Sequence, residues 1–244
     1  MKPIFSRSRK YETEGFTLIE LLVVMGIIVL MMALVAPAFN AIKGGQDVTS
    51  TTYNIAGILE QARAYAMANN THVYVGFQEV NVNNASTLSP QVAGTGRIAV
   101  AVVASKSGTS ITGSTYGTGA ALLTPVSPLQ HFENMHMAGT ALTSSGNMAR
   151  PPVSASYQLG NSSFPSVTPF YWPIGSASGS AQYSFAQVIE FDPQGTAFPS
   201  GATTMVQYME LGLQQTHGTA VSAISNGAAV QIDGMTGSTR IYRP

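Results

Sequence analysis

The sequence predicts an α+β fold, in which one long N-terminal helix packs on an antiparallel β-sheet. Three observations support this prediction. Residues 16–36 form an apolar run whose only charged residue is Glu20. An apolar stripe at helical spacing follows between Ile55 and Ala66. From residue 71 onward, short apolar or alternating segments are separated by stretches rich in Gly, Pro, Ser and Asn, which is typical of strands and turns.

The apolar run is long enough to cross a membrane as a helix, because about 20 apolar residues span the ~30 Å hydrocarbon core. Residues 1–15 are polar and net basic, so we expect them to stay on the cytoplasmic side. We predict a transmembrane helix over residues 16–43. The alternative is an ordinary secretory signal peptide, for which Ala36-Pro37-Ala38 offers a cleavage site. The run, however, exceeds the usual 7–15 residues of such a peptide.

The carboxylate of Glu20 needs a cationic partner, because inserting an unpaired charged carboxylate into hydrocarbon costs at least ~2.5–3.5 kcal/mol. No Lys or Arg lies inside the apolar run. Cleavage between Gly15 and Phe16 would expose an amine one helical turn away. We therefore expect Glu20 to pair with this amine, either its own or that of a neighbouring copy.

The string Gly15-Phe16-Thr17-Leu18-Ile19-Glu20, with its basic leader and apolar helix, resembles the type III signal of type IV pilins and type II secretion pseudopilins. The resemblance implies cleavage after Gly15 by prepilin peptidase, N-methylation of Phe16 and a role for Glu20 in filament assembly. It also implies a location in the bacterial inner membrane, with the head outside the cytoplasm and later in a filament. The implied partners are other subunits, an inner-membrane assembly platform and membrane lipid. Pro37 matches a proline of the family, and its missing N–H predicts a bend in the helix.

The rest of the chain is predicted as residues 44–70, the amphipathic half of the helix, and residues 71–244, a β-rich head. Gly44-Gly45 is a second weak point in the helix, and Glu60 and Arg63 are spaced to pair. The head has an irregular insertion at about residues 138–180. Strands are predicted at residues 72–77, 97–104, 121–126, 130–135, 184–191, 204–213, 228–233 and 238–242, the last two as a hairpin.

Three segments, one late in the helix and two in the head, resemble the H-type minor pseudopilins and their FimT-like pilin relatives. These segments are residues 59–66, residues 189–195 and the terminal hairpin from Val230 to Tyr242. Together they imply a minor subunit that works by assembly and partner binding, and not as an enzyme. One alternative is a FimT-like pilin that binds DNA through Arg240 and Arg243, although two arginines neutralise at most two phosphates. Two further alternatives are a major filament subunit and a membrane-anchored receptor or enzyme that reuses a pilin anchor.

Few other residues indicate a site. The chain has no cysteine, and charged residues make up 9% of it. The four histidines are scattered, and His131 and His136 have the wrong spacing for a shared strand face, so we predict no metal site and no cofactor. Asp192 and Asp233 lie in turns, where such residues usually bond their own backbone. The aromatic residues of the insertion fit local packing better than a partner-binding loop; they are Phe164, Phe170, Tyr171 and Trp172.

Overall fold

The chain divides into two compact units, Met1–Lys43 and Gly44–Pro244, in a computed structural model. The structure describes residues 17–111, 122–142, 148–166, 170–202, 204–222 and 227–243, and the side chains of residues 33–46 are not among those described. The boundary between the units falls at Gly44-Gly45, which was predicted as a weak point.

Helix α1 runs from Leu18 to Asn69, and its backbone stays helical through Pro37 and the glycine pair. The bend at Pro37 stays a prediction. The helix ends where Asn70 takes a left-handed conformation with φ of 49°. The N–H of Thr71 then donates to the carbonyl of Ala66 over 3.1 Å, which satisfies one of the last carbonyls of the helix. The stop predicted at residues 69–70 is confirmed.

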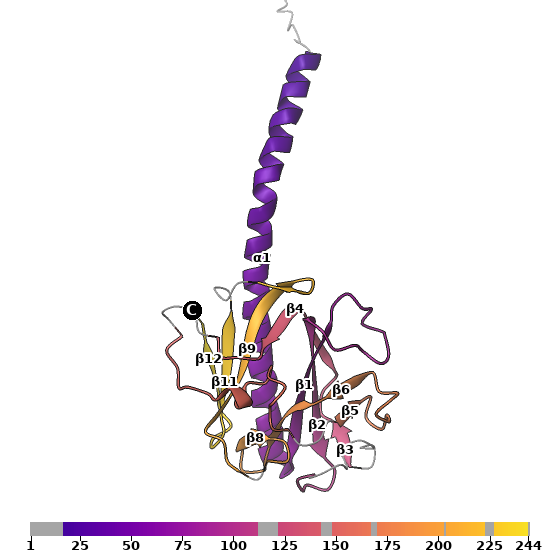
Figure 1. The fold of residues 1–244 in the computed structure, drawn as a ribbon, viewed down its shortest axis with the longest axis vertical. Coiled ribbons are helices and arrows are strands. Elements are labelled where there is room, and N and C mark those ends of the chain that lie inside the picture. The colour runs from indigo at the N-terminus through magenta and orange to yellow at the C-terminus, as the bar shows by residue number, and fades with distance from the viewer. Residues whose placement is uncertain are drawn as a thin grey trace, which may run out of the picture. The chain divides into compact units, whose positions relative to one another are not determined.

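The Gly44–Pro244 unit is built on a ten-stranded antiparallel sheet, whose main path runs β12-β11-β9-β4-β2-β1-β7-β8 (Figure 1). Strand β10 extends β9 as a hairpin, and β3 pairs with β2. The strands are β1 (Val73–Asn81), β2 (Gly96–Ser105), β3 (Leu123–Pro125), β4 (Gln130–Ala138), β7 (Gln187–Phe191), β8 (Ala197–Pro199), β9 (Tyr208–His217), β10 (Ala220–Val221), β11 (Ala228–Asp233) and β12 (Thr239–Tyr242).

One face of the sheet forms the main core with the second half of α1. Side chains alternate between the two faces of a strand, so on β2 Ile98, Val100 and Val102 face this core. From α1, Ile55 and Leu59 are fully buried against them, as the apolar stripe predicted. Figure 1 shows α1 passing behind the strands on this face.

The opposite face of the sheet is also covered, by a separate two-stranded sheet of β5 (Phe170–Trp172) and β6 (Tyr183–Phe185). This explains why β2 is buried along its whole length. A Cβ on Gly76 would lie 2.6 Å from the ring of Phe170 and from Cβ of Phe185, so β1 needs glycine here. The predicted irregular insertion is therefore partly regular, because it contains β5 and the short 3₁₀ helix η2 (Ala155–Tyr157).

The predicted fold class is wrong and is corrected to a mainly β architecture. The chain is 36% strand and 22% helix, and the sheet is a curled antiparallel half-barrel. The N-terminal helix is not packed on the sheet along its length: among the described side chains of α1, only those between Val48 and Ala66 enter the core, and residues 17–32 are all exposed. Two physical reasons account for the difference. Among the described side chains of α1, only those of its second half contribute to the core, and short strands that the sequence did not indicate enlarge the β part.

The predicted location is also corrected. Within the described residues, no helix has the length and apolar character that a membrane crossing requires. A single pass through a bacterial inner membrane by residues 16–43 conflicts with this finding.

Candidate functional site

The N-terminal end of α1 carries the predicted assembly residues. Gly15 and Phe16, the predicted cleavage and methylation positions, lie outside the described residues. Glu20 lies exposed in the first turn of α1. Its N–H donates to the hydroxyl oxygen of Thr17 over 3.3 Å and to the carbonyl of Thr17 over 3.1 Å.

This geometry gives Glu20 a local role that the sequence analysis missed. The spacing Thr-x-x-Glu at a helix start is that of a capping box, of which the Thr17 hydroxyl supplies one half. A carboxylate in the first turn is also favoured by the partial positive charge of the helix N-terminus. The Thr17–Glu20 spacing was the signal that would have indicated it.

The first half of α1 presents an apolar surface with no partner among the described residues. Its large side chains are exposed on every side of the helix, for example Leu18 at 83% and Met32 at 67%. Burying one such side chain is worth about 1.5–3 kcal/mol. A helix that is apolar all round is normally buried, so this surface is suited to packing against other apolar helices.

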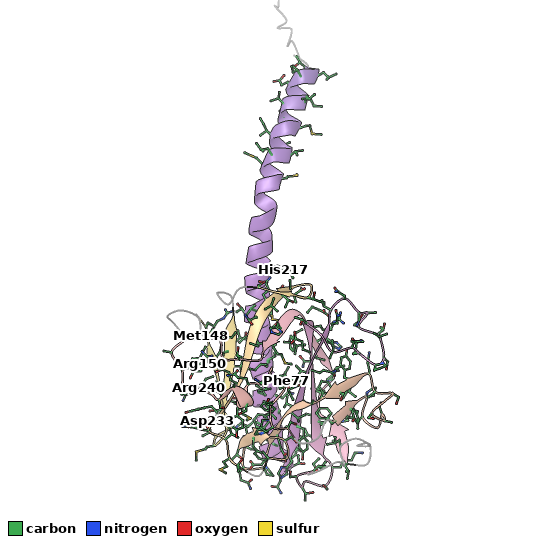
Figure 2. All side chains as sticks on the ribbon, viewed as in Figure 1. Phe77, Met148, Arg150, His217, Asp233 and Arg240 are labelled. Atoms are coloured by element: carbon green, nitrogen blue, oxygen red, sulfur yellow. The ribbon has the colours of Figure 1, made fainter. Side chains whose placement is uncertain are left out.

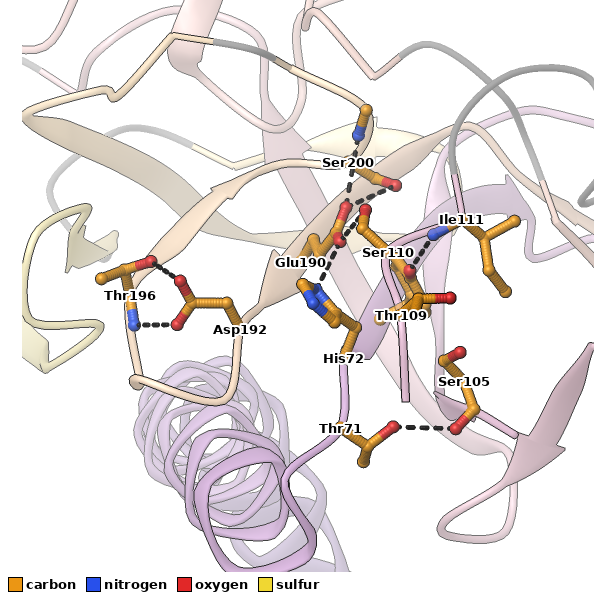
Figure 3. A network of polar contacts seen from close by, with 12 residues as sticks. Thr71, His72, Ser105, Thr109, Ser110, Ile111, Glu190, Asp192, Thr196 and Ser200 are labelled. Atoms are coloured by element: carbon orange, nitrogen blue, oxygen red, sulfur yellow. Dashed lines mark hydrogen bonds and ion pairs between the residues drawn. The ribbon is translucent and has the colours of Figure 1, made fainter. Parts of the chain in front are cut away.

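A buried carboxylate, Glu190 on β7, holds together the end of α1 and two loops (Figure 3). Its Oε1 lies 2.9 Å from Nδ1 of His72 and accepts a hydrogen bond of 2.6 Å from the hydroxyl of Ser110. Its Oε2 accepts from the N–H of Gly201 over 3.3 Å and from the hydroxyl of Ser200 over 3.5 Å. Four partners compensate the cost of burying the charge.

This network has the residue types of a hydrolase triad but a different geometry. In a triad the imidazole contacts the serine hydroxyl and takes its proton. Here the hydroxyl of Ser110 donates directly to Glu190, and His72 contacts the same carboxylate oxygen. The arrangement anchors residues 106–111 and residues 200–201 to the sheet, and it does not activate Ser110.

A second acid, the half-buried Glu79 on β1, lies at an irregularity between β2 and β4. The register of these strands shifts between Gly96 and Arg97. The carboxylate of Glu79 accepts from the N–H groups of Gly96 and Met137, each over 3.2 Å, and lies 2.9 Å from Nδ1 of His136. It therefore satisfies backbone donors that the irregular ladder leaves without a strand partner.

His131 lies on β4 and contacts the small sheet instead of a metal. Its Nε2 is 2.8 Å from the phenol oxygen of Tyr183 on β6. Burial lowers the pKa of His131, and it raises the pKa of Tyr183. Among the described residues, no three His, Asp or Glu side chains are placed to share a metal ion.

The remaining residues singled out from the sequence have local roles, and Figure 2 labels two of them, Asp233 and Arg240. The Asp192 carboxylate accepts from the N–H groups of Gln194 and Thr196, and Asp233 does the same in its own turn, as predicted. Arg240 is exposed on β12, and Arg243 donates to the hydroxyl of Thr49 over 2.7 Å. In the insertion, Phe164 and Phe170 are buried and Tyr171 and Trp172 half-buried, which confirms local packing.

Comparisons with known proteins find no match. No family model matches the chain, and neither a curated protein nor a solved structure matches it. The predicted assignments to pilins, to secretion and to membrane proteins therefore have no support from relatives. The transmembrane assignment is contradicted by the described helix itself.

Proposed function

We propose that the protein is a minor subunit of a helical filament, of the pseudopilus or type IV pilus-like kind that its N-terminal string resembles. It works by assembly and partner binding. Prepilin peptidase removes the leader between Gly15 and Phe16, and the first half of α1 then packs against the same segment of other subunits. The observation that carries the proposal is the exposed apolar surface between Leu18 and Met32.

Helix-to-helix burial accounts for this surface better than any partner within the chain. The main core is already filled from α1 by residues between Val48 and Ala66. An apolar patch much larger than a few hundred Å² on a protein surface marks an interaction site. Identical helices that pack side by side bury such surfaces on one another, and they leave the Gly44–Pro244 unit to contact partners.

The proposal is tested by the state of the chain in cells and by assembly. Mass spectrometry of the recovered protein is expected to find Phe16 as the first residue, and Gly15→Leu is expected to leave the leader attached. Ile27→Asp is expected to abolish cross-linking between copies, because it places a charge in the buried helical surface. Val221→Asp, at an exposed position in β10, is the matched control and keeps cross-linking.

Two results would overturn the proposal. One is an N-terminus elsewhere than Phe16 in the assembled protein. The other is cross-linking of the Ile27→Asp variant at the level of its control, because assembly would then not depend on the apolar surface.

Glu20 needs a separate pair of variants, because it has two possible roles. If its carboxylate pairs with a neighbour's amine, Glu20→Gln loses assembly while Thr17→Ala retains it. If it acts only in the local cap, the two variants lower the helicity of the first turn alike and both assemble. Circular dichroism and cross-linking of the two variants separate these roles.

A further inference from the structure

A polar groove lies at the C-terminal end of α1, within the Gly44–Pro244 unit. Its volume is about 440 Å³, which is within the range of about 300–1,000 Å³ typical of small-molecule sites. The end of the helix forms one wall with Tyr65, Asn69 and Asn70. The segment after β2 forms the other with Lys106 and Ser107.

The second wall is held in place before any ligand arrives. The hydroxyl of Thr71 donates to the carbonyl of Ser105 over 2.8 Å, which ties the end of the helix to β2. Further along, Ser110 is bonded to the buried Glu190, and the N–H of Ile111 donates to the phenol oxygen of Tyr74 over 2.8 Å. Figure 3 shows the contact of Thr71 with Ser105 and that of Ser110 with Glu190. Such pre-organisation lowers the cost of binding.

The groove offers neutral hydrogen-bonding groups in an ordered array. Ser105 and Ser107 both line the groove, and their hydroxyl oxygens are 3.1 Å apart. The amide of Asn69 is oriented by its hydrogen bond of 3.0 Å to the carbonyl of Tyr65. Amides and hydroxyls both donate and accept, as a ligand with several hydroxyl groups requires.

Electrostatics disfavour an anion here. None of the described residues that line the groove carries a carboxylate, and Lys106 is the one charged residue among them. The C-terminal end of a helix, however, bears a partial negative charge of about half an elementary charge, which opposes an anion and offsets much of the attraction of one exposed lysine. The half-buried ring of Tyr65 adds an apolar surface beside the polar groups.

We propose that this groove binds a neutral carbohydrate, with the sugar hydroxyls bonded to Asn69, Asn70 and Ser107 and a C–H face of the ring against Tyr65. This binding is independent of the proposed assembly, because none of these residues belongs to the apolar half of α1. The Gly44–Pro244 unit would then bind a neutral carbohydrate in addition to any protein partner.

The test is saturation-transfer NMR with the purified full-length protein and three probes: N-acetylglucosamine, methyl α-glucoside and methyl β-galactoside. At least one probe is expected to receive saturation at its ring protons. The double variant Asn69→Ala/Ser107→Ala is expected to bind that probe about tenfold or more weakly, because each lost hydrogen bond is worth about 0.5–1.5 kcal/mol. The control Asn54→Ala/Ser154→Ala, at exposed positions outside the groove, is expected to bind like the wild type.

Three outcomes would overturn the proposal. They are no saturation transfer to any probe, equal binding by the groove variant and its control, and displacement of the sugar by an equal concentration of inorganic phosphate. The last result would identify an anion site. All four substituted side chains are exposed, so equal unfolding midpoints of the two variants exclude a folding defect as the cause of lost binding.

Discussion

The guanidinium of Arg150 forms a bidentate ion pair with the carboxylate of Glu210, and both side chains are almost inaccessible to solvent. Nε lies 2.6 Å from Oε2 and Nη2 lies 2.8 Å from Oε1, and the two side chains are 7% and 1% exposed. Gln158 donates to the same carboxylate over 3.1 Å. The pair fastens the segment after residue 148 to β9, and the hydrogen bond to Glu210 raises the pKa of Arg150.

Removal of one partner from this pair is expected to be costly. Arg150→Met leaves the carboxylate of Glu210 buried without its cation, which typically costs about 3–5 kcal/mol. Urea denaturation of the full-length chain measures the loss. The double variant Arg150→Met/Glu210→Leu is expected to recover most of it, because no charge is then buried. A double variant no more stable than Arg150→Met would contradict this account.

Two glycines are expected to respond to alanine in opposite directions. Gly76→Ala places a methyl group 2.6 Å from Phe170 and Phe185, and such overpacking costs about 1–3 kcal/mol. Gly57→Ala, in α1, meets nothing within 4 Å and is expected to stabilise by about 0.5–1 kcal/mol through helix propensity. Thermal unfolding of both variants checks the pair, and equal shifts would show that β5 and β6 do not pack on β1 as described.

Glu190→Gln is expected to destabilise the protein by about 1–3 kcal/mol. In glutamine an NH₂ group replaces one carboxylate oxygen, and this group cannot accept a hydrogen bond. Either Ser110 or Gly201 then loses its acceptor, and a buried donor left unpaired costs this much. Glu133→Gln is the matched control, because Glu133 is 47% exposed and the glutamine oxygen can still accept the hydrogen bond from Nε of Arg97. Chemical denaturation of both variants measures the difference, and a loss for Glu133→Gln as large as for Glu190→Gln would count against the network.

The contact of His131 with Tyr183 predicts a dependence of stability on pH. Burial, aided by the charge of Arg97 and opposed by that of Glu133, lowers the pKa of His131 below its usual 6.5. As pH falls through 6.5, His131 becomes protonated in the unfolded chain while it stays neutral in the folded chain. The contribution of His131 to stability is therefore present above pH 6.5 and is lost as pH falls toward the folded pKa.

Comparison of the wild type with His131→Gln isolates this effect from the other histidines. The difference in unfolding free energy between the two is expected to shrink from pH 7.5 to pH 5. A difference that stays constant over this range would show that His131 does not titrate differently in the folded and unfolded states.

Local patterns in the sequence were sufficient to predict those segments whose structure depends mainly on residues nearby in the chain. The strand predicted at residues 97–104 is found as β2, because apolar side chains on both faces leave no other conformation that buries them. The terminal hairpin is confirmed by the pairing of β11 with β12. The pair of Glu60 and Arg63 forms over 3.6 Å, one helical turn apart.

The long-range features could not be predicted in this way. Strand β5 is three residues long and pairs with β6, so its apolar pattern is too short to indicate a strand by itself. The side-chain partners of Glu190 are His72, Ser110 and Ser200, and the most distant of them, His72, is 118 residues away along the chain. Nothing in the sequence around a glutamate distinguishes one that will be buried, because its burial depends on which strands become its neighbours.

The sequence by itself determined the helix, most of the long strands and the aspartate turns, because each depends on side-chain periodicity or on hydrogen bonds within a few residues. Only the tertiary structure decided the order of strands in the sheet, the cover formed by β5 and β6, and the burial of Glu190 and Glu210. Those features require contacts between segments that are distant in the chain, and their free energy appears only after the sheet has brought the segments together.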